Sequence, residues 1–144
     1  MIVTEEAFPE LHGKVAMVDG GFDPLHPGHV GYFRAAAALG APVFCSVSPD
    51  AWVARKHAVL LLQDERIALI DAIRFVDYTY AAQSTTAEVL ALLRPRFYVK
   101  GDDWRDRLPQ EELDVCTREG IEVVFLDTVT NSSTEILRRQ AERG

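Results

Sequence analysis

Short apolar runs alternate with amphipathic stretches along the chain. The apolar runs have the length of buried strands and fall at residues 15–19, 43–47, 78–81, 97–99 and 123–126. The stretches between and after them have helical character and fall at residues 27–39, 64–75, 85–93, 109–119 and 132–143. Strands joined by helical crossovers predict an α/β domain in which helices cover both faces of a five-stranded parallel sheet.

Capping signals mark the start of two predicted helices. Thr85 is followed three positions later by Glu88, which is the spacing of a capping box, and Pro95 ends this helix. Ser132 and Glu135 repeat that spacing at the start of the last helix. In open parallel sheets the ligand binds at the carboxyl ends of the strands, so we expect the site in the loops that follow the strands.

Composition and charge narrow the possible functions. The 144 residues are 48% hydrophobic and 26% charged, which is typical of one globular domain spanning residues 1–144. A net charge of −7 argues against a nucleic-acid partner. The longest nearly apolar run, residues 35–45, is too short to span a bilayer, and the acidic N-terminal stretch is unlike a signal peptide. We therefore expect a cytoplasmic protein without a membrane partner.

The loop after the first predicted strand carries the strongest chemical signal. Gly20 and Gly21 allow a ligand to approach the backbone closely. His26 and His29 bracket a Pro-Gly pair at the start of a helix, where free N–H groups and positive potential favour a phosphate. Both imidazoles can donate hydrogen bonds to phosphoryl oxygens. The loop has neither a Rossmann G-x-G-x-x-G fingerprint nor a P-loop, which argues against a dehydrogenase.

Three other loops carry residues that suit a phosphorylated ligand. After the fourth strand, Lys100 can meet a phosphate, and Asp102 or Asp103 can bind a base amino group, a sugar hydroxyl or Mg²⁺. After the second strand, a basic stretch at residues 55–57 can clamp outer phosphates. The last loop presents hydroxyls at residues 132–134 before a helix. Each loop also has a plainer interpretation, as a charged turn, a solvated loop or a helix cap.

Two of these motifs resemble the signatures of a known superfamily. The sequence H-P-G-H at residues 26–29 follows G-G-F-D at residues 20–23 and resembles the H-x-G-H signature of the cytidylyltransferase-like nucleotidyltransferases. The sequence N-S-S-T at residues 131–134 resembles their second signature, a Ser/Thr run that opens the final helix. The resemblance covers nearly the whole chain and implies a Rossmann-like three-layer α/β sandwich.

The resemblance also implies roles for individual residues. Catalysis would be carried by His26, His29 and Lys56, and the acceptor would be bound by Asp50, Lys56 and Arg74. The nucleotide would be bound by Gly20, Gly21, Phe22, Asp23, His26, Gly28, His29, Lys100, Gly101, Asp102, Asn131, Ser132, Ser133 and Thr134. Arg138, one helical turn after Thr134, would be a further contact to the phosphates.

Two branches of the superfamily are the most similar. Residues 94–104 resemble the P-D-x-L-V-K-G-G-D-Y stretch of the adenylyltransferase domain of ADP-heptose synthase, which works on a heptose 1-phosphate. Residues 101–104 and 73–77 are similar to motifs of glycerol-3-phosphate cytidylyltransferase. The final motif of that cytidylyltransferase begins with an arginine where this chain has Asp127, which favours the first branch. A further departure is Gly21, where many members carry Thr.

The implied reaction joins a nucleotide to a phosphate. A nucleoside monophosphate passes from an NTP, with ATP favoured, to a phosphorylated acceptor such as a sugar 1-phosphate, and pyrophosphate is released. Mg²⁺ would bridge the triphosphate mainly through phosphate oxygens and water. Related enzymes are commonly dimers, so a homodimer is expected. The alternatives are a CTP-dependent glycerol-3-phosphate cytidylyltransferase and a nucleotide sensor without catalysis.

Overall fold

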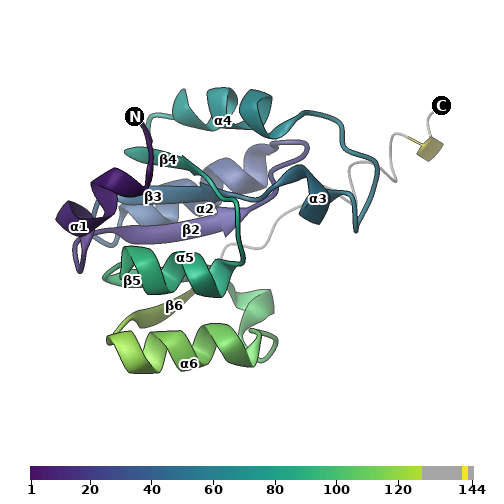
Figure 1. The fold of residues 1–144 in the computed structure, drawn as a ribbon. Helices are drawn as coiled ribbons and strands as arrows, with labels where there is room; N and C mark the ends of the chain where they lie inside the picture. The colour runs from purple at the N-terminus through teal and green to yellow at the C-terminus, as the bar shows by residue number, and fades with distance from the viewer. Residues whose placement is uncertain (128–140, 143–144) are drawn as a thin grey trace.

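Six parallel strands form the centre of the computed structural model, which describes residues 1–127 and 141–142 (Figure 1). In chain order they are β1 (Ile2–Val3), β2 (Ala16–Gly20), β3 (Val43–Val47), β4 (Tyr78–Ala81), β5 (Phe97–Gly101) and β6 (Glu122–Leu126). Their order in the sheet is β1-β4-β3-β2-β5-β6, and every neighbouring pair is parallel. The predicted parallel α/β architecture is therefore confirmed.

The prediction of five strands is wrong by one. β1 adds a sixth strand at the edge of the sheet, where Ile2 pairs with Thr79 and Val3 with Tyr80. A strand of 2 residues is too short to show an alternating pattern, so hydrophobic periodicity could not predict it. The N-terminal ammonium holds this edge in place, because it lies 2.7 Å from the Asp71 carboxylate.

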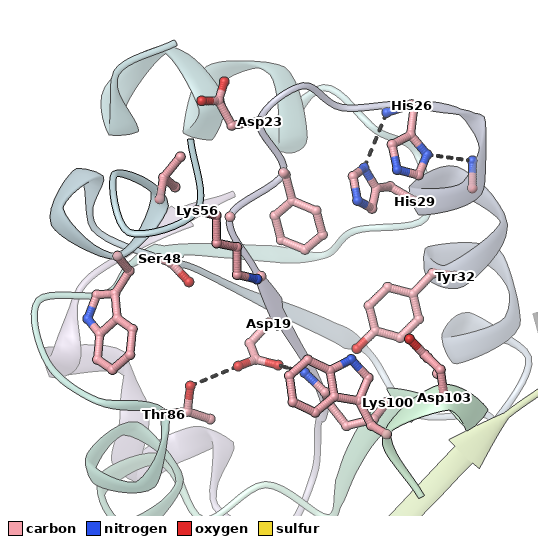
Figure 2. A pocket seen from close by; sticks show the side chains of 18 of the residues that line it. Asp19, Asp23, His26, His29, Tyr32, Ser48, Lys56, Thr86, Lys100 and Asp103 are labelled. Atoms are coloured by element: carbon pink, nitrogen blue, oxygen red, sulfur yellow. Dashed lines mark hydrogen bonds and ion pairs between the residues drawn. The ribbon is translucent and has the colours of Figure 1, made fainter. Parts of the chain in front are cut away.

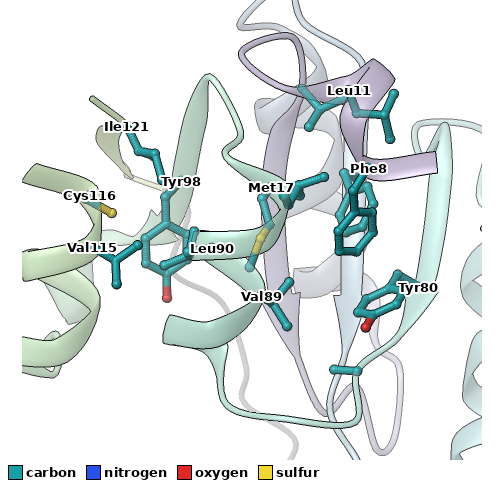
Figure 3. Close-up of a cluster of buried hydrophobic side chains, with 14 of the residues drawn as sticks. Phe8, Leu11, Met17, Tyr80, Val89, Leu90, Tyr98, Val115, Cys116 and Ile121 are labelled. Atoms are coloured by element: carbon teal, nitrogen blue, oxygen red, sulfur yellow. The ribbon is translucent and has the colours of Figure 1, made fainter. Parts of the chain in front are cut away.

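Helices cover both faces of the sheet, as predicted. They are α1 (Phe8–Leu11), α2 (Pro27–Ala37), α3 (Asp50–Val53), α4 (Gln63–Asp71), α5 (Thr86–Leu93) and α6 (Gln110–Glu119), with 3-10 turns η1 (Glu5–Ala7) and η2 (Asp102–Trp104). α1, α5 and α6 bury one cluster of apolar side chains against the sheet, in which Phe8, Leu90 and Val115 take part (Figure 3). α2 and α4 bury the second cluster, which includes Phe33 and Ile70. These two clusters form the hydrophobic core.

Local capping explains where several helices begin and end. The Thr85 hydroxyl accepts a hydrogen bond from the Glu88 N–H at 3.2 Å, so Thr85 is the N-cap predicted for α5. α6 ends at Gly120, whose φ of 68° is the left-handed conformation that glycine adopts without strain. The helix predicted over residues 64–75 is shorter than expected, because turns after Asp71 lead directly into β4. The helix predicted over residues 132–143 lies almost entirely outside the described residues.

None of the helices in residues 1–127 combines the length and the apolar character needed to cross a membrane.

Candidate functional site

A cleft of about 550 Å³ opens at the carboxyl ends of β2 and β5, where the fold predicts a ligand site (Figure 2). It is lined by residues of β2, the loop before α2, α2 itself, the segment after β3, β5 with η2, and the first turns of α5 and α6. The lining residues are Asp19, Gly20, Gly21, Phe22, Asp23, His26, Gly28, His29, Tyr32, Ser48, Trp52, Val53, Lys56, His57, Thr86, Tyr98, Lys100, Gly101, Asp103, Trp104, Pro109 and Glu112.

The rings of His26 and His29 are stacked against each other at the N-terminus of α2. Their ring centroids are 3.6 Å apart and the rings are inclined by 25°. The backbone N–H of Gly28 donates to Nδ1 of His26 at 3.1 Å, and the backbone N–H of His26 donates to Nδ1 of His29 at 3.2 Å (Figure 2). A ring nitrogen that accepts a hydrogen bond carries no proton, so each neutral imidazole has its proton on Nε2.

Both histidines are neutral donors at pH 7. Burial, together with the smaller effect of the nearby His26, lowers the pKa of His29 to about 3. Burial also lowers the pKa of His26. Nε2 of His26 is buried and finds no hydrogen-bond partner among the described residues. Each ring can therefore offer one N–H to a ligand oxygen without bringing in a positive charge.

The start of α2 differs from the sequence expectation of free backbone N–H groups. Pro27 has no N–H, Gly28 donates to the His26 ring, and the His29 N–H donates to the His26 carbonyl at 2.9 Å. The two histidine side chains thus form a capping box at the start of α2, in the places that Ser and Glu take in an ordinary capping box. The expectation is wrong because the two histidines use the backbone donors of this turn themselves. Their Nε2–H groups are the donors left for a ligand.

Asp23 braces the loop that carries the histidines. Its side chain is buried, and its carboxylate accepts hydrogen bonds from the N–H groups of Leu60 at 2.8 Å and Leu61 at 2.9 Å. The sequence pattern suggested that Asp23 binds the nucleotide. In the structure, Asp23 lines the cleft and also fastens the α2 loop to the segment between α3 and α4.

Arg66 also holds the loops around the cleft together, and it was not among the predicted site residues. It is only 1% exposed, although it lies on an otherwise polar stretch of α4. Its guanidinium donates to the carbonyls of Gly21 and Ser48 at 2.8 Å, and to the Asp50 carboxylate at 2.6 Å. A further hydrogen bond reaches the Leu61 carbonyl at 3.0 Å. One buried side chain thus joins three loops around the cleft.

Several predicted site residues do not line the cleft. Asp50 is engaged by Arg66, and the Arg74 guanidinium lies 5.1 Å from the centre of the Phe75 ring. Asp102 is paired with Arg105 at 2.7 Å, and the neighbouring Asp103 faces the cleft in its place. The segment Asn131, Ser132, Ser133 and Thr134, together with Arg138, lies outside the described residues.

The basic stretch after β3 is divided between the cleft and the surface. Lys56 and His57 line the cleft, whereas the Arg55 guanidinium lies over the Trp52 ring, 4.3 Å from its centre. Within residues 1–127 the structure gives Lys56 no ion-pair partner. Lys56 is therefore available to meet an anionic ligand.

Asp19 and Lys100 form a largely buried ion pair on the floor of the cleft. Nζ of Lys100 lies 3.0 Å from Oδ1 of Asp19, and the side chains of both are 10% exposed. Oδ2 of Asp19 accepts a hydrogen bond from the Thr86 hydroxyl at 2.8 Å (Figure 2). The Trp104 ring covers the lysine, with its centre 4.3 Å from Nζ. Neither Asp19 nor Thr86 was among the predicted site residues.

A second polar pair, Tyr98 and Glu112, closes the end of the cleft beside α6. The Tyr98 hydroxyl donates to the Glu112 carboxylate. Burial raises the pKa of Glu112, and the hydrogen bond from Tyr98 partly offsets this. Burial also raises the pKa of Tyr98, as do the nearby carboxylates. Tyr98 is therefore protonated at neutral pH and acts as a donor.

The packing of α3 explains why position 21 is glycine. A Cβ placed on Gly21 would lie 3.0 Å from Cγ2 of Val53, a contact that forces one of the two to move. By the resemblance to the superfamily, Thr would be a common residue at this position. In this chain, α3 occupies the space that the larger side chain would need.

A histidine-lined cleft at the carboxyl edge of a parallel α/β sheet is the arrangement expected of a nucleotidyltransferase. Residues 17–139 match the model of the family described as cytidylyltransferase-like. The chain therefore belongs to the cytidylyltransferase-like family of nucleotidyltransferases, as its two motifs predicted.

The chain is also similar to curated proteins named HldE. The chain is 36% identical over 134 residues to the bifunctional protein HldE of Azorhizobium caulinodans, and this match covers 89% of the chain and 27% of that protein. It is 35% identical over 136 residues to HldE of Azotobacter vinelandii, covering 88% of the chain and 28% of that protein. The chain thus spans less than a third of these relatives.

A solved structure shares the fold. The lipopolysaccharide core biosynthesis protein of Thermoplasma volcanium superposes with a TM-score of 0.69 at 21% identity. The match covers 81% of this chain and 98% of that protein. At this level of identity the similarity shows the fold alone.

Proposed function

We propose that this protein transfers the adenylyl group of ATP to a phosphorylated acceptor such as a sugar 1-phosphate and releases pyrophosphate. The observation that carries the proposal is the stacked pair of His26 and His29, whose Nε2–H groups are the donors left for a ligand in the cleft. Membership of a nucleotidyltransferase family supports the reaction type. The similarity to HldE proteins and to the ADP-heptose synthase pattern supports ATP and a sugar phosphate.

In this mechanism the residues of the chain position the phosphates and stabilise charge. An oxygen of the acceptor phosphate attacks the α-phosphorus of ATP in line, the bond to the bridging oxygen breaks, and pyrophosphate leaves. The acceptor is already ionised, so the step needs no general base. His26 and His29 donate to the oxygens on which charge builds, and Lys56 binds the outer phosphates.

Mg²⁺ enters this reaction as part of the substrate. Among the described residues, no three His, Cys, Asp or Glu side chains come together as a metal-binding cluster. The triphosphate itself offers the hard oxygen ligands that Mg²⁺ prefers. We therefore expect the magnesium complex of ATP to be the form that binds, with the ion held mainly by phosphate oxygens and water.

The test is the initial rate of pyrophosphate release with Mg²⁺, in which ATP and CTP are each combined with a heptose 1-phosphate, glycerol 3-phosphate and other phosphates. The proposal predicts turnover with ATP and a sugar 1-phosphate. Turnover only with CTP and glycerol 3-phosphate would contradict it and establish the cytidylyltransferase alternative, to which residues 101–104 are similar. Nucleotide binding without turnover of any pair would indicate a sensor.

A further inference from the structure

A small recess adjoins the main cleft at Asp19. It has a volume of about 40 Å³ and shares Asp19, Ser48, Trp52 and Thr86 with the cleft. Its complete lining is Asp19, Ser46, Ser48, Pro49, Trp52, Ala82, Ser84 and Thr86. The recess is large enough for a hydroxymethyl group but too small for a sugar ring.

The recess is rich in hydroxyl groups. Ser46 lies in β3 and Ser48 directly follows this strand, whereas Thr86 is the first residue of α5 and Ser84 lies in the segment before it. Ser46 is paired with Asp19 in the register of β3 and β2, which brings the two residues side by side. Within the described part of the chain, the side chains of Ser46, Ser48 and Ser84 form no hydrogen bond. These three hydroxyls are available to a polar group that enters the recess.

The charges in the cleft favour one orientation of a phosphorylated ligand. The Asp19 carboxylate repels a phosphate, and it only accepts hydrogen bonds. Each of its oxygens receives one hydrogen bond, from Lys100 or from Thr86, and keeps another acceptor position. Phosphates are favoured elsewhere in the cleft, near Lys56 and the two histidines. The floor around Asp19 suits a hydroxyl donor.

We infer that Asp19 and this recess bind the hydroxylated end of the acceptor. The inference rests on the proposed function and narrows it, because it makes the acceptor a phosphorylated polyol or sugar. Its phosphate lies toward His26, His29 and Lys56, and one hydroxyl donates to Asp19 at the entrance of the recess. Lys100 then has a different role from the predicted phosphate contact, because its ammonium pairs with the Asp19 carboxylate at 3.0 Å and holds it in place.

Binding measurements on the full chain test this inference. Titration calorimetry with Mg²⁺ and a non-hydrolysable ATP analogue would compare a heptose 1-phosphate and glycerol 3-phosphate with ethyl phosphate, which has no hydroxyl. We expect at least one hydroxylated phosphate to bind about 10- to 100-fold more tightly, as for a hydrogen bond to a charged group. Equal affinities for all three would overturn the inference.

Three variants make the test specific. Asp19→Asn should remove most of the preference for the hydroxylated phosphate and leave the affinity for the ATP analogue unchanged. Thr86→Val, which removes one hydrogen bond to Asp19, should weaken the preference by a smaller factor. Asp114→Asn is the matched control, because Asp114 is an exposed carboxylate on α6 outside the cleft. Circular dichroism would check that each variant is folded.

The outcomes separate the two proposals. If the ATP analogue does not bind the native protein, the proposed function fails and the inference fails with it. If the analogue binds but Asp19→Asn keeps the full preference, only the inference is overturned. An equal loss of analogue and acceptor affinity in Asp19→Asn would also overturn it, because Asp19 would then act on the nucleotide.

Discussion

The guanidinium of Arg66 donates a hydrogen bond to the carbonyl of Gly21 at 2.8 Å. This bond connects α4 to the glycine turn, which is the turn at Gly20 and Gly21 beside the cleft. The same group reaches Ser48, Leu61 and Asp50. With Gly21, these partners lie in three segments around the cleft, because Ser48 and Asp50 share the segment after β3. Arg66 therefore sets the relative positions of the glycine turn and the segment that carries Lys56.

Replacing Arg66 should destabilise the protein strongly. Arg66→Met leaves several carbonyl oxygens without their donor and removes the partner of Asp50, which should cost about 2–5 kcal/mol of unfolding free energy. Urea unfolding measures this loss. Arg118→Met is the control: Arg118 is exposed and bonded to Glu119, so its loss should stay within about 0.5 kcal/mol. Equal effects of the two substitutions would show that Arg66 does not hold the loops.

Stability should depend on pH through His29. Its pKa falls from 6.5 to about 3 in the folded state, so between these values the unfolded chain binds more protons. The unfolding free energy should therefore be highest above pH 6.5 and fall as the pH drops toward 3. Urea unfolding at a series of pH values should show a smaller fall for His29→Gln than for the native protein. A fall of the same size in both would contradict the assignment, and His12→Gln serves as the control outside the cleft.

Position 21 should reject a larger side chain because of Val53. Gly21→Ala places a Cβ 3.0 Å from Cγ2 of Val53, and this overpacking should cost about 1–3 kcal/mol. In the double variant with Val53→Ala, the cost of adding Cβ at position 21 should be much smaller than in the native background. A double-mutant cycle of unfolding free energies measures the coupling. Additive effects would show that Val53 is not the obstacle.

The fold followed from the sequence because its strands and helices have clear patterns. The run at residues 43–47 coincides with β3, and the run at residues 78–81 coincides with β4. The capping pattern also identified Thr85 as the N-cap of α5. The strand Ile2–Val3 escaped prediction because 2 residues carry no period.

The site could be predicted only as far as its residues are neighbours in sequence. His26 and His29 were found because they share one loop with the glycines. Asp19 and Thr86 are 67 positions apart, and only the folded sheet brings them together. The polar stretch of α4 around Arg66 suggests an exposed side chain. In the structure Arg66 is buried because three loops converge on it.

His29→Ala tests most directly whether the stacked histidines stabilise the reacting phosphates. The measurement is the rate of pyrophosphate release from Mg²⁺ and ATP with the best acceptor, in the native protein, in His29→Ala and in the control His12→Ala. Removing one such donor typically costs about 10²–10³ in turnover. We expect a loss of at least that size in folded His29→Ala and native turnover in the control. Near-native turnover in folded His29→Ala would contradict it.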